Sequence, residues 1–319
     1  MEEKLFDCLV LGGGPAGMNA ALYATRGNVK TAIIDISSLG GQPVNYLEIE
    51  NYLGFPTIEG WELADKFEQH LSKFNVEIFS NEEIQKIDLI SEIKTIETLK
   101  AIYKAKTVIL ATGANASKLG IKGEKELTGN GVSYCAVCDG AFYRNKTVLV
   151  VGGGNAAVEE GMYLTKFADK VYIMHRRNQL RADKIVQQRA FQNEKVEFLF
   201  DCVPLEILDE NGKVAKVLYK NVKTEEVKTL DVQGVFPYIG FSPNTEHFNG
   251  QIQQDEKGFI MVDENMRTST MGVFAAGDVR RTPLRQVITA VADGAVAGVS
   301  AVKYLEELES MTKMETITA

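Results

Sequence analysis

Histidine and cysteine are scarce in this 319-residue sequence, and their scarcity limits the sites that it can form. A structural zinc site needs four ligands, but the four cysteines supply one Cys-x-x-Cys pair, and the three histidines, His70, His175 and His247, are scattered. We therefore expect no metal site. Four cysteines in a chain of this size also do not make a disulfide scaffold, and reducing surroundings would suit a catalytic dithiol.

The sequence also lacks the features of a membrane or nucleic-acid-binding protein. We expect that no apolar run is long enough to cross a bilayer. Glu2 and Glu3 stand where a signal peptide would be basic. The net charge of -8 disfavours nucleic acid and anionic membranes as partners. We therefore expect a cytoplasmic protein, and its 45% hydrophobic content provides for two globular domains.

The two cysteines that stand together lie in the segment Cys135-Ala136-Val137-Cys138-Asp139-Gly140. Their spacing permits a disulfide or a reactive dithiol, and Asp139 could carry the proton that a departing thiolate needs. The alternative is a pair of buried structural cysteines that fall two residues apart by chance. A glycine-rich phosphate loop on each side of the segment favours the redox interpretation.

The first phosphate loop is Gly12-x-Gly14-x-x-Gly17, between a predicted strand at 6–11 and a predicted helix at 18–26. The next predicted strand, 30–34, ends at Asp35, which follows the last glycine of the loop by 18 residues. This order and spacing are typical of a dinucleotide site whose acidic residue binds a ribose hydroxyl. The ligand here should therefore carry a free 2′-hydroxyl, as FAD does.

The second loop is Gly152-Gly153-Gly154-Asn155-Ala156-Ala157, between a predicted strand at 147–151 and a predicted helix at 158–167. Its next strand ends in His175-Arg176-Arg177, at the same 18-residue offset, and Arg181 follows. Guanidinium groups at this position would pair with a 2′-phosphate, which favours NADPH over NADH. The alternative is a solvated charge cluster on a surface turn.

Other segments complete an alternation of strands and helices that predicts an α/β fold. A buried strand at 107–110 ends in Ala111-Thr112-Gly113, and a strand at 272–279 contains Gly277-Asp278. Strands at 196–200, 214–221 and 226–231 are expected to form an antiparallel excursion over the second unit. A long helix should follow Arg285-Gln286 and end near residue 308, with a frayed tail from Ser310.

With these motifs the chain resembles the bacterial-type, low-molecular-weight thioredoxin reductases. The resemblance covers nearly the whole length and rests on six motifs in order: Gly-Gly-Gly-Pro-Ala-Gly (12–17), Gly-Gly-Gln (40–42), Ala-Thr-Gly (111–113), Cys-Ala-Val-Cys-Asp-Gly (135–140), His-Arg-Arg-x-x-x-Arg-Ala (175–182), and Gly-Asp-Val (277–279) with Arg-Gln (285–286). It implies two Rossmann-like three-layer domains. An NADPH domain, 117–244, would be inserted into an FAD domain made of 1–116 and 245–319, whereas the residues alone allow two tandem domains equally.

The resemblance also implies how the sites work. Cys138 would face the flavin and take electrons there, which would reduce the disulfide between Cys138 and Cys135. Cys135 would then attack the disulfide of thioredoxin. Asp139 would serve as the acid–base group. A homodimer and a rotating NADPH domain are implied too. The residues expected at FAD are Gly12, Gly14, Pro15, Ala16, Gly17, Asp35, Gly41, Gln42, Asn51, Ala111, Thr112, Gly113, Gly277, Asp278, Arg285 and Gln286. Those expected at NADPH are Gly152, Gly154, Asn155, Ala156, His175, Arg176, Arg177 and Arg181.

Two departures and several alternatives accompany this hypothesis. The family commonly has Asp-Ser where Asn155-Ala156 stand, and Pro43-Val44-Asn45-Tyr46 is unusual. Ferredoxin– or flavodoxin–NADP reductases lack the Cys-x-x-Cys, and glutathione-reductase-like enzymes carry theirs after the first loop. Ferredoxin as the donor, or a different dithiol protein as the acceptor, remains open. A non-catalytic flavin sensor is disfavoured because it has little need of the arginine cluster.

Overall fold

The computed structural model describes residues 2–45, 49, 51–134 and 136–318. It divides into two compact units. Unit 1 comprises Met1–Asn115 and Ser242–Ala319, and unit 2 comprises Ala116–Phe241. The α/β class that the resemblance implies is found, and in the sequence unit 2 lies between the two segments of unit 1. The crossings between the units, β7 (Ala114–Ala116) and β15 (Phe241–Pro243), pair with each other as a two-stranded sheet.

Unit 1 contains a seven-stranded sheet in the order β3-β2-β1-β6-β5-β4, with β16 also paired to β6. Strands β1, β2, β3, β6 and β16 pair in parallel, whereas β5 pairs antiparallel with both β4 and the first half of β6. The strands are β1 (Glu2–Leu11), β2 (Thr31–Ile34), β3 (Val76–Phe79), β4 (Ile84–Asp88), β5 (Lys94–Thr98), β6 (Ala101–Leu110) and β16 (Val273–Ala275). The parallel strands are apolar runs because both of their faces are covered.

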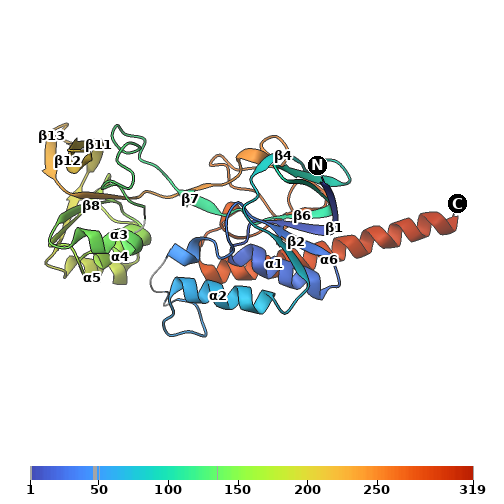
Figure 1. Ribbon diagram of the computed structural model, residues 1–319. Coiled ribbons are helices and arrows are strands. Elements are labelled where there is room, and N and C mark those ends of the chain that lie inside the picture. Colours follow the sequence, from blue (N-terminus) through green and yellow to red (C-terminus); the bar gives the residue numbers. More distant parts are fainter. Residues whose placement is uncertain (1, 46–48, 50, 135, 319) are drawn as a thin grey trace. The chain divides into compact units, whose positions relative to one another are not determined.

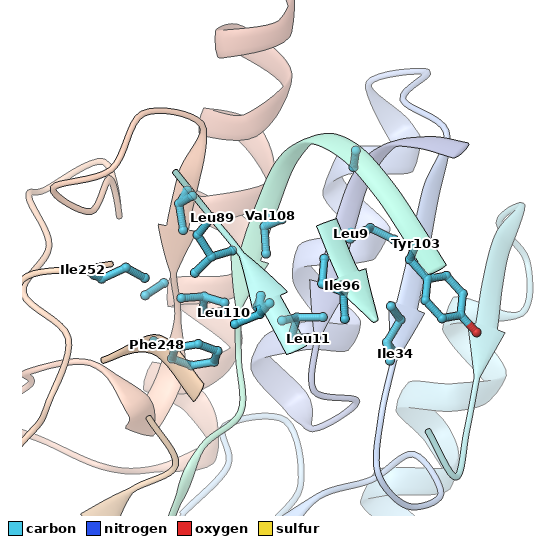
Figure 2. Packing of buried hydrophobic residues seen from close by; sticks show 14 of the residues in the cluster. Leu9, Leu11, Ile34, Leu89, Ile96, Tyr103, Val108, Leu110, Phe248 and Ile252 are labelled. Atoms are coloured by element: carbon cyan, nitrogen blue, oxygen red, sulfur yellow. The ribbon is translucent and has the colours of Figure 1, made fainter. Parts of the chain in front are cut away.

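Alternate residues of these strands face two different cores. Leu9 and Leu110 point into the first core, which includes Phe248 (Figure 2). Val10 and Ile109 point into the second core, against the helices. The helices of unit 1 are α1 (Pro15–Arg26), α2 (Gly60–Leu71) and α6 (Val287–Thr318) (Figure 1). Because β1, β2, β6 and β16 run parallel to one another, their carboxyl ends lie at the same end of the sheet.

Helices α1 and α6 lie in direct backbone contact. A Cβ added at Gly294 of α6 would lie 2.1 Å from the carbonyl oxygen of Ala16, and one added at Gly298 would lie 2.5 Å from that of Ala20. Only glycine permits so close an approach. The crossing therefore fixes α6 to the start of α1, which follows the first phosphate loop.

Helix α6 differs from expectation in two ways. Within the described residues, Val287–Met311 is long and apolar enough by length and composition to cross a membrane, so the expectation that no run would suffice is wrong on those criteria. One such helix is weak evidence for a span, and Ala297, Ala301 and Leu305 are buried in the second core. The helix also continues to Thr318, where fraying was expected from Ser310, because Leu, Glu, Met and Lys are good helix formers.

Unit 2 contains a parallel four-stranded sheet in the order β10-β9-β8-β14. Its strands are β8 (Thr147–Gly152), β9 (Lys170–His175), β10 (Val196–Phe200) and β14 (Gly234–Tyr238), and its helices are α3 (Ala136–Asp139), α4 (Asn155–Leu164) and α5 (Lys184–Phe191). Placing 196–200 in an antiparallel excursion was therefore wrong. Helix α5 connects β9 to β10, and such a crossover returns the chain parallel to the strand that it left.

The antiparallel excursion itself consists of β11 (Cys202–Glu210), β12 (Lys213–Asn221) and β13 (Val227–Asp231). The prediction missed β11, although its sequence signal was present. Asn211 and Gly212 both have positive φ, 54° and 75°, which is the backbone of a two-residue hairpin turn. Short 3-10 helices complete the chain: Gln42–Asn45, Gly140–Tyr143, Glu246–Phe248 and Gly277–Val279.

Candidate active site

Backbone atoms pack closely against the first phosphate loop of unit 1. A Cβ at Gly12, whose φ is +107°, would lie 2.3 Å from the carbonyl oxygen of Ala111, and a Cβ at Gly17 would lie 1.8 Å from that of Gly12. Glycine is therefore required at both positions. The loop folds tightly over the ends of β1 and β6, and the N-terminus of α1, with buried Pro15 and Ala16, follows it. Free N–H groups at a helix N-terminus favour a phosphate ligand.

Asp35 is held at the end of β2, beside this loop. Its Oδ2 accepts a hydrogen bond from the N–H of Gly13, and its Oδ1 accepts one from the N–H of Ser37 at 2.7 Å. These bonds orient the carboxylate next to the loop, as the ribose assignment needs.

Two further glycines close on the same loop from distant parts of the sequence. A Cβ at Gly41, with φ +63°, would lie 2.8 Å from the Cα of Gly14, and one at Gly277, with φ +76°, would lie 2.8 Å from the Cβ of Ala16. The structure thus brings four predicted segments together at the carboxyl ends of the strands, where their glycines let the backbones approach one another closely.

Asp278 and Arg285 lie at the same end of the sheet. Burial raises the pKa of Asp278 to about 6, and the nearby guanidinium of Arg285 opposes this rise. The Nε of Arg285 is buried and has no hydrogen-bond partner among the described residues, while its guanidinium carbon lies 4.1 Å from the ring centroid of Phe259. A partly buried acid beside a donor without a partner is suited to a polar ligand.

The remaining residues assigned to FAD are bonded within unit 1. Asn51 donates its side-chain amide to Oε1 of Gln286 at 2.8 Å. Thr112 donates its hydroxyl to the carbonyl oxygen of Asn244 at 2.8 Å, and the Asn244 side chain donates back to the Thr112 carbonyl oxygen at 2.9 Å. Gln42 donates to the Ala114 carbonyl oxygen at 3.4 Å. Gly113 adopts φ +70° and accepts from the N–H of Asn244.

Asp293, which the sequence interpretation missed, supports this site from α6. The guanidinium of Arg280 donates two hydrogen bonds to its carboxylate, each 2.6 Å long, and the N–H of Gly277 donates a third at 3.1 Å. Asp293 is 7% exposed. The sequence signal that could have identified it is that Asp293 is the single acidic residue in the first turns of the largely apolar helix α6. Its bonds hold the turn that carries Asp278.

The second phosphate loop, in unit 2, has the same construction. A Cβ at Gly152 would lie 2.3 Å from the carbonyl oxygen of Tyr238, whereas a Cβ at Gly154 would meet nothing within 4 Å. The open side at Gly154 precedes α4, whose first residues, Asn155 and Ala156, are exposed. The open face and the helix N-terminus are suited to a pyrophosphate.

His175 and the three arginines have different surroundings. The imidazole of His175 is 4% exposed and packs under Gly153, where an added Cβ would lie 2.4 Å from Nδ1. Burial, followed by the charges of Arg181, Arg177 and Arg176, lowers the pKa of His175, so the ring is neutral at pH 7. The arginine side chains are exposed. His175 thus supports the loop, and the guanidinium groups are free to meet a ligand.

The redox segment is described only in part. Cys135 lies outside the described residues, as does the side chain of Cys138, while Asp139 is half-buried at the end of α3. The flanking residues are anchored: Ala136 donates its N–H to the hydroxyl of Tyr238, and Tyr134 donates its hydroxyl to Glu124, both at 2.8 Å.

Glu160 lies on α4, the helix that packs against α3. Burial, then the neighbouring charge of Glu159, raises the pKa of Glu160 to about 7. Its Oε2 has no hydrogen-bond partner among the described residues. A carboxyl group that titrates near neutral pH therefore stands on the helix beside the redox segment.

Comparison with known proteins places these features in one family. The family model described as pyridine nucleotide-disulphide oxidoreductase matches residues 6–294. The chain is similar to the thioredoxin reductase of Listeria innocua, with 47% identity over 314 residues that cover 98% of each chain. Among solved structures it is similar to Lactococcus lactis thioredoxin reductase in the FR conformation, with 47% identity, a TM-score of 0.90 and coverage of 95% and 99% of the two chains. A ferredoxin-flavin thioredoxin reductase of Clostridium acetobutylicum matches at 32% identity with a TM-score of 0.54, over 96% of this chain and 100% of that one.

Proposed function

The chain belongs to the pyridine nucleotide-disulphide oxidoreductases, and on that premise we propose that it is an NADPH-dependent thioredoxin–disulfide reductase. The observation that carries the proposal is the combination of two glycine-walled phosphate loops with one Cys-x-x-Cys segment, in a chain 47% identical to a thioredoxin reductase over 98% of its length. The cofactors are FAD and NADPH.

The residues of each loop fit one of these cofactors. In unit 1 an acidic residue, Asp35, stands at the ribose position, which suits the free hydroxyls of FAD. In unit 2 the corresponding position carries exposed arginines, which suit the 2′-phosphate of NADPH. We therefore assign unit 1, expected as 1–116 and 245–319, to FAD and unit 2, expected as 117–244, to NADPH.

The chain's own residues complete the electron transfer. FAD held by unit 1 would supply a carrier that can accept two electrons from NADPH. The disulfide between Cys135 and Cys138 gains those two electrons and two protons and becomes a dithiol. Cys135, as a thiolate, attacks one sulfur of the thioredoxin disulfide, and Cys138 then attacks Cys135, which reforms the original disulfide and releases reduced thioredoxin. Asp139 carries the proton that the departing thiolate takes up.

We propose further that the protein is a cytoplasmic homodimer. Exposed apolar side chains of unit 1 support the dimer, among them Leu53 at 92% exposure and Trp61 at 57%. Sedimentation of the FAD-loaded protein at several concentrations tests it, and a mass of one chain throughout would contradict it.

Ferredoxin as electron donor is the alternative, because one matched structure is a ferredoxin-flavin enzyme. The exposed cluster of Arg176, Arg177 and Arg181 favours NADPH. An anaerobic titration with NADPH and then NADH, followed by flavin absorbance, separates the two. Bleaching by near-stoichiometric NADPH, reversed by oxidised thioredoxin, is expected. A yellow protein that NADPH does not bleach would refute the proposal, and reduced ferredoxin would then be tried.

A further inference from the structure

We propose that Asn155 and Asp183 form a clamp that positions Arg181 for the 2′-phosphate and thereby sets the preference for a 2′-phosphorylated nucleotide. This inference rests on the proposed use of NADPH and adds two positioning residues to it. It starts from a pair of hydrogen bonds that joins the second phosphate loop to the arginine-bearing segment.

The clamp is reciprocal. Asn155 donates its side-chain amide to Oδ2 of Asp183 at 2.7 Å, and the backbone N–H of Asp183 donates to Oδ1 of Asn155, also at 2.7 Å. Asn155 is the first residue of α4, and Asp183 immediately precedes α5. The two bonds therefore tie the start of one helix to the start of the next.

The segment between the clamp and the arginines is anchored to the same loop. The N–H groups of Arg181 and Ala182 both donate to the carbonyl oxygen of Gly153, at 2.6 and 3.1 Å. Together with the clamp, these bonds hold the backbone of 181–183 against two residues of the loop, Gly153 and Asn155. The exposed guanidinium of Arg181 thus extends from an anchored backbone, which lowers the entropy that it loses when it binds a phosphate.

Charge gives the clamp a second role. Within the described part of the chain, no salt bridge engages Arg176, Arg177 or Arg181, although Asp183 stands two residues from Arg181. The Asp183 carboxylate is instead bound by the neutral amide of Asn155. The amide therefore keeps this carboxylate from neutralising the arginines that the 2′-phosphate needs.

The same geometry accounts for the departure at residue 155. An aspartate there would place two carboxylates in direct contact, because the present amide lies 2.7 Å from Oδ2 of Asp183. The simpler interpretation is that Asp183 only caps α5. However, its side chain makes no capping hydrogen bond to that helix. The Asp183 carboxylate therefore bonds to Asn155 of the second phosphate loop and not to the N-terminus of α5.

The test measures binding of two adenine nucleotides to the full-length, FAD-loaded protein by calorimetry. Adenosine 2′,5′-bisphosphate carries the 2′-phosphate, and adenosine 5′-monophosphate lacks it. Asn155→Ala removes both clamp bonds and should weaken binding of the bisphosphate about tenfold, equivalent to about 1.4 kcal/mol, while monophosphate binding changes less than twofold. Asn155→Asp should weaken bisphosphate binding at least as much.

Two variants keep the test interpretable. Asp183→Asn preserves an oxygen acceptor for the Asn155 amide and removes a negative charge two residues from Arg181, so it should bind the bisphosphate at least as tightly as the wild type, and weaker binding would refute the clamp. Asn193→Ala removes the side-chain hydrogen bond to the Thr165 hydroxyl elsewhere in unit 2 and should leave both affinities unchanged. The clamp is refuted if Asn155→Ala weakens neither nucleotide, or weakens both equally. A wild-type protein that binds the two nucleotides equally would instead refute the proposed NADPH specificity itself.

Discussion

The backbone N–H of Ala136 donates a hydrogen bond to the hydroxyl of Tyr238 at 2.8 Å, although the two residues lie 102 positions apart. Ala136 begins α3, inside the Cys-x-x-Cys segment, and Tyr238 ends β14, where its carbonyl oxygen also walls Gly152. One residue thus touches both the redox segment and the second phosphate loop. The bond fixes where α3 begins.

Replacing Tyr238 by Phe removes this hydroxyl and leaves the buried N–H of Ala136 without that acceptor. Such a loss costs roughly 1–3 kcal/mol. We expect a lower free energy of unfolding and a kcat for thioredoxin reduction that falls several-fold, with the KM for NADPH unchanged. Tyr172→Phe, a tyrosine of β9, is the matched control. Unaltered kcat and stability in Tyr238→Phe would show that the bond does not position the segment.

The cysteine variants test the electron relay directly. Cys135→Ser and Cys138→Ser should each abolish thioredoxin reduction, because a lone thiol cannot complete the two-electron exchange. Flavin content should stay at the wild-type level, since the proposed FAD site lies in unit 1 and the two cysteines belong to unit 2. Turnover with oxidised thioredoxin and flavin absorbance measure the two outcomes. Retained turnover in either variant would contradict the relay.

The glycines of the first phosphate loop could be predicted from the sequence, because close backbone contacts dictate their spacing. The loop glycines Gly12 and Gly17 meet carbonyl oxygens, so no other residue fits, and the motif is readable without the fold. Asp35 was predicted from its offset, because one helix and one strand, α1 and β2, separate it from the loop. The sheet order around β10 was not found, since a short apolar run looks the same in a parallel and an antiparallel strand.

Residues that act through others were missed for a different reason. Asp293, Asp183 and Tyr238 each bond a segment far away in the sequence, and their partners are backbone groups or single side chains. Such pairs leave no periodic pattern. His175 shows the converse: it stands at the predicted ribose offset, yet the structure buries its ring beneath Gly153.

The arginine cluster makes a prediction about nucleotide choice. Arg176→Ala and Arg181→Ala should raise the KM for NADPH at least tenfold, because each removes a proposed charged partner of the 2′-phosphate, and such a partner contributes about 1.5–3 kcal/mol. The KM for NADH should change little. Steady-state kinetics with both nucleotides provide the measurement. An equal rise for both would show that the cluster does not bind the 2′-phosphate.

Glu160 predicts a pH dependence of stability. Its pKa is raised from an ordinary value of 4.5 to about 7 in the folded protein, so the buried neutral form is favoured at low pH and folding loses that advantage as pH rises through 7. Glu160→Gln removes the titration. Relative to wild type, the variant should gain stability between pH 5 and pH 8, by up to about 3 kcal/mol.

Denaturant unfolding at pH 5 and pH 8 measures this gain. Gln192→Ala, at an exposed position of unit 2 that carries no titratable group, is the control and should follow the pH dependence of the wild type. If Glu160→Gln and wild type lose stability in parallel as pH rises, then the carboxyl group of Glu160 does not titrate in this range, and the pH dependence must come from other groups.

The crossing of α1 and α6 links stability to FAD binding. An added Cβ at Gly294 would lie 2.1 Å from the carbonyl oxygen of Ala16, a backbone atom that cannot move alone, so Gly294→Ala must push the helices apart. We expect a loss of about 1–3 kcal/mol in the free energy of unfolding. Because Ala16 lies within the first phosphate loop, we expect FAD affinity to fall with it. Val296→Ala, on the exposed side of α6, should change neither quantity much. Normal FAD affinity in a destabilised Gly294→Ala protein would mean that the loop holds its shape without the crossing.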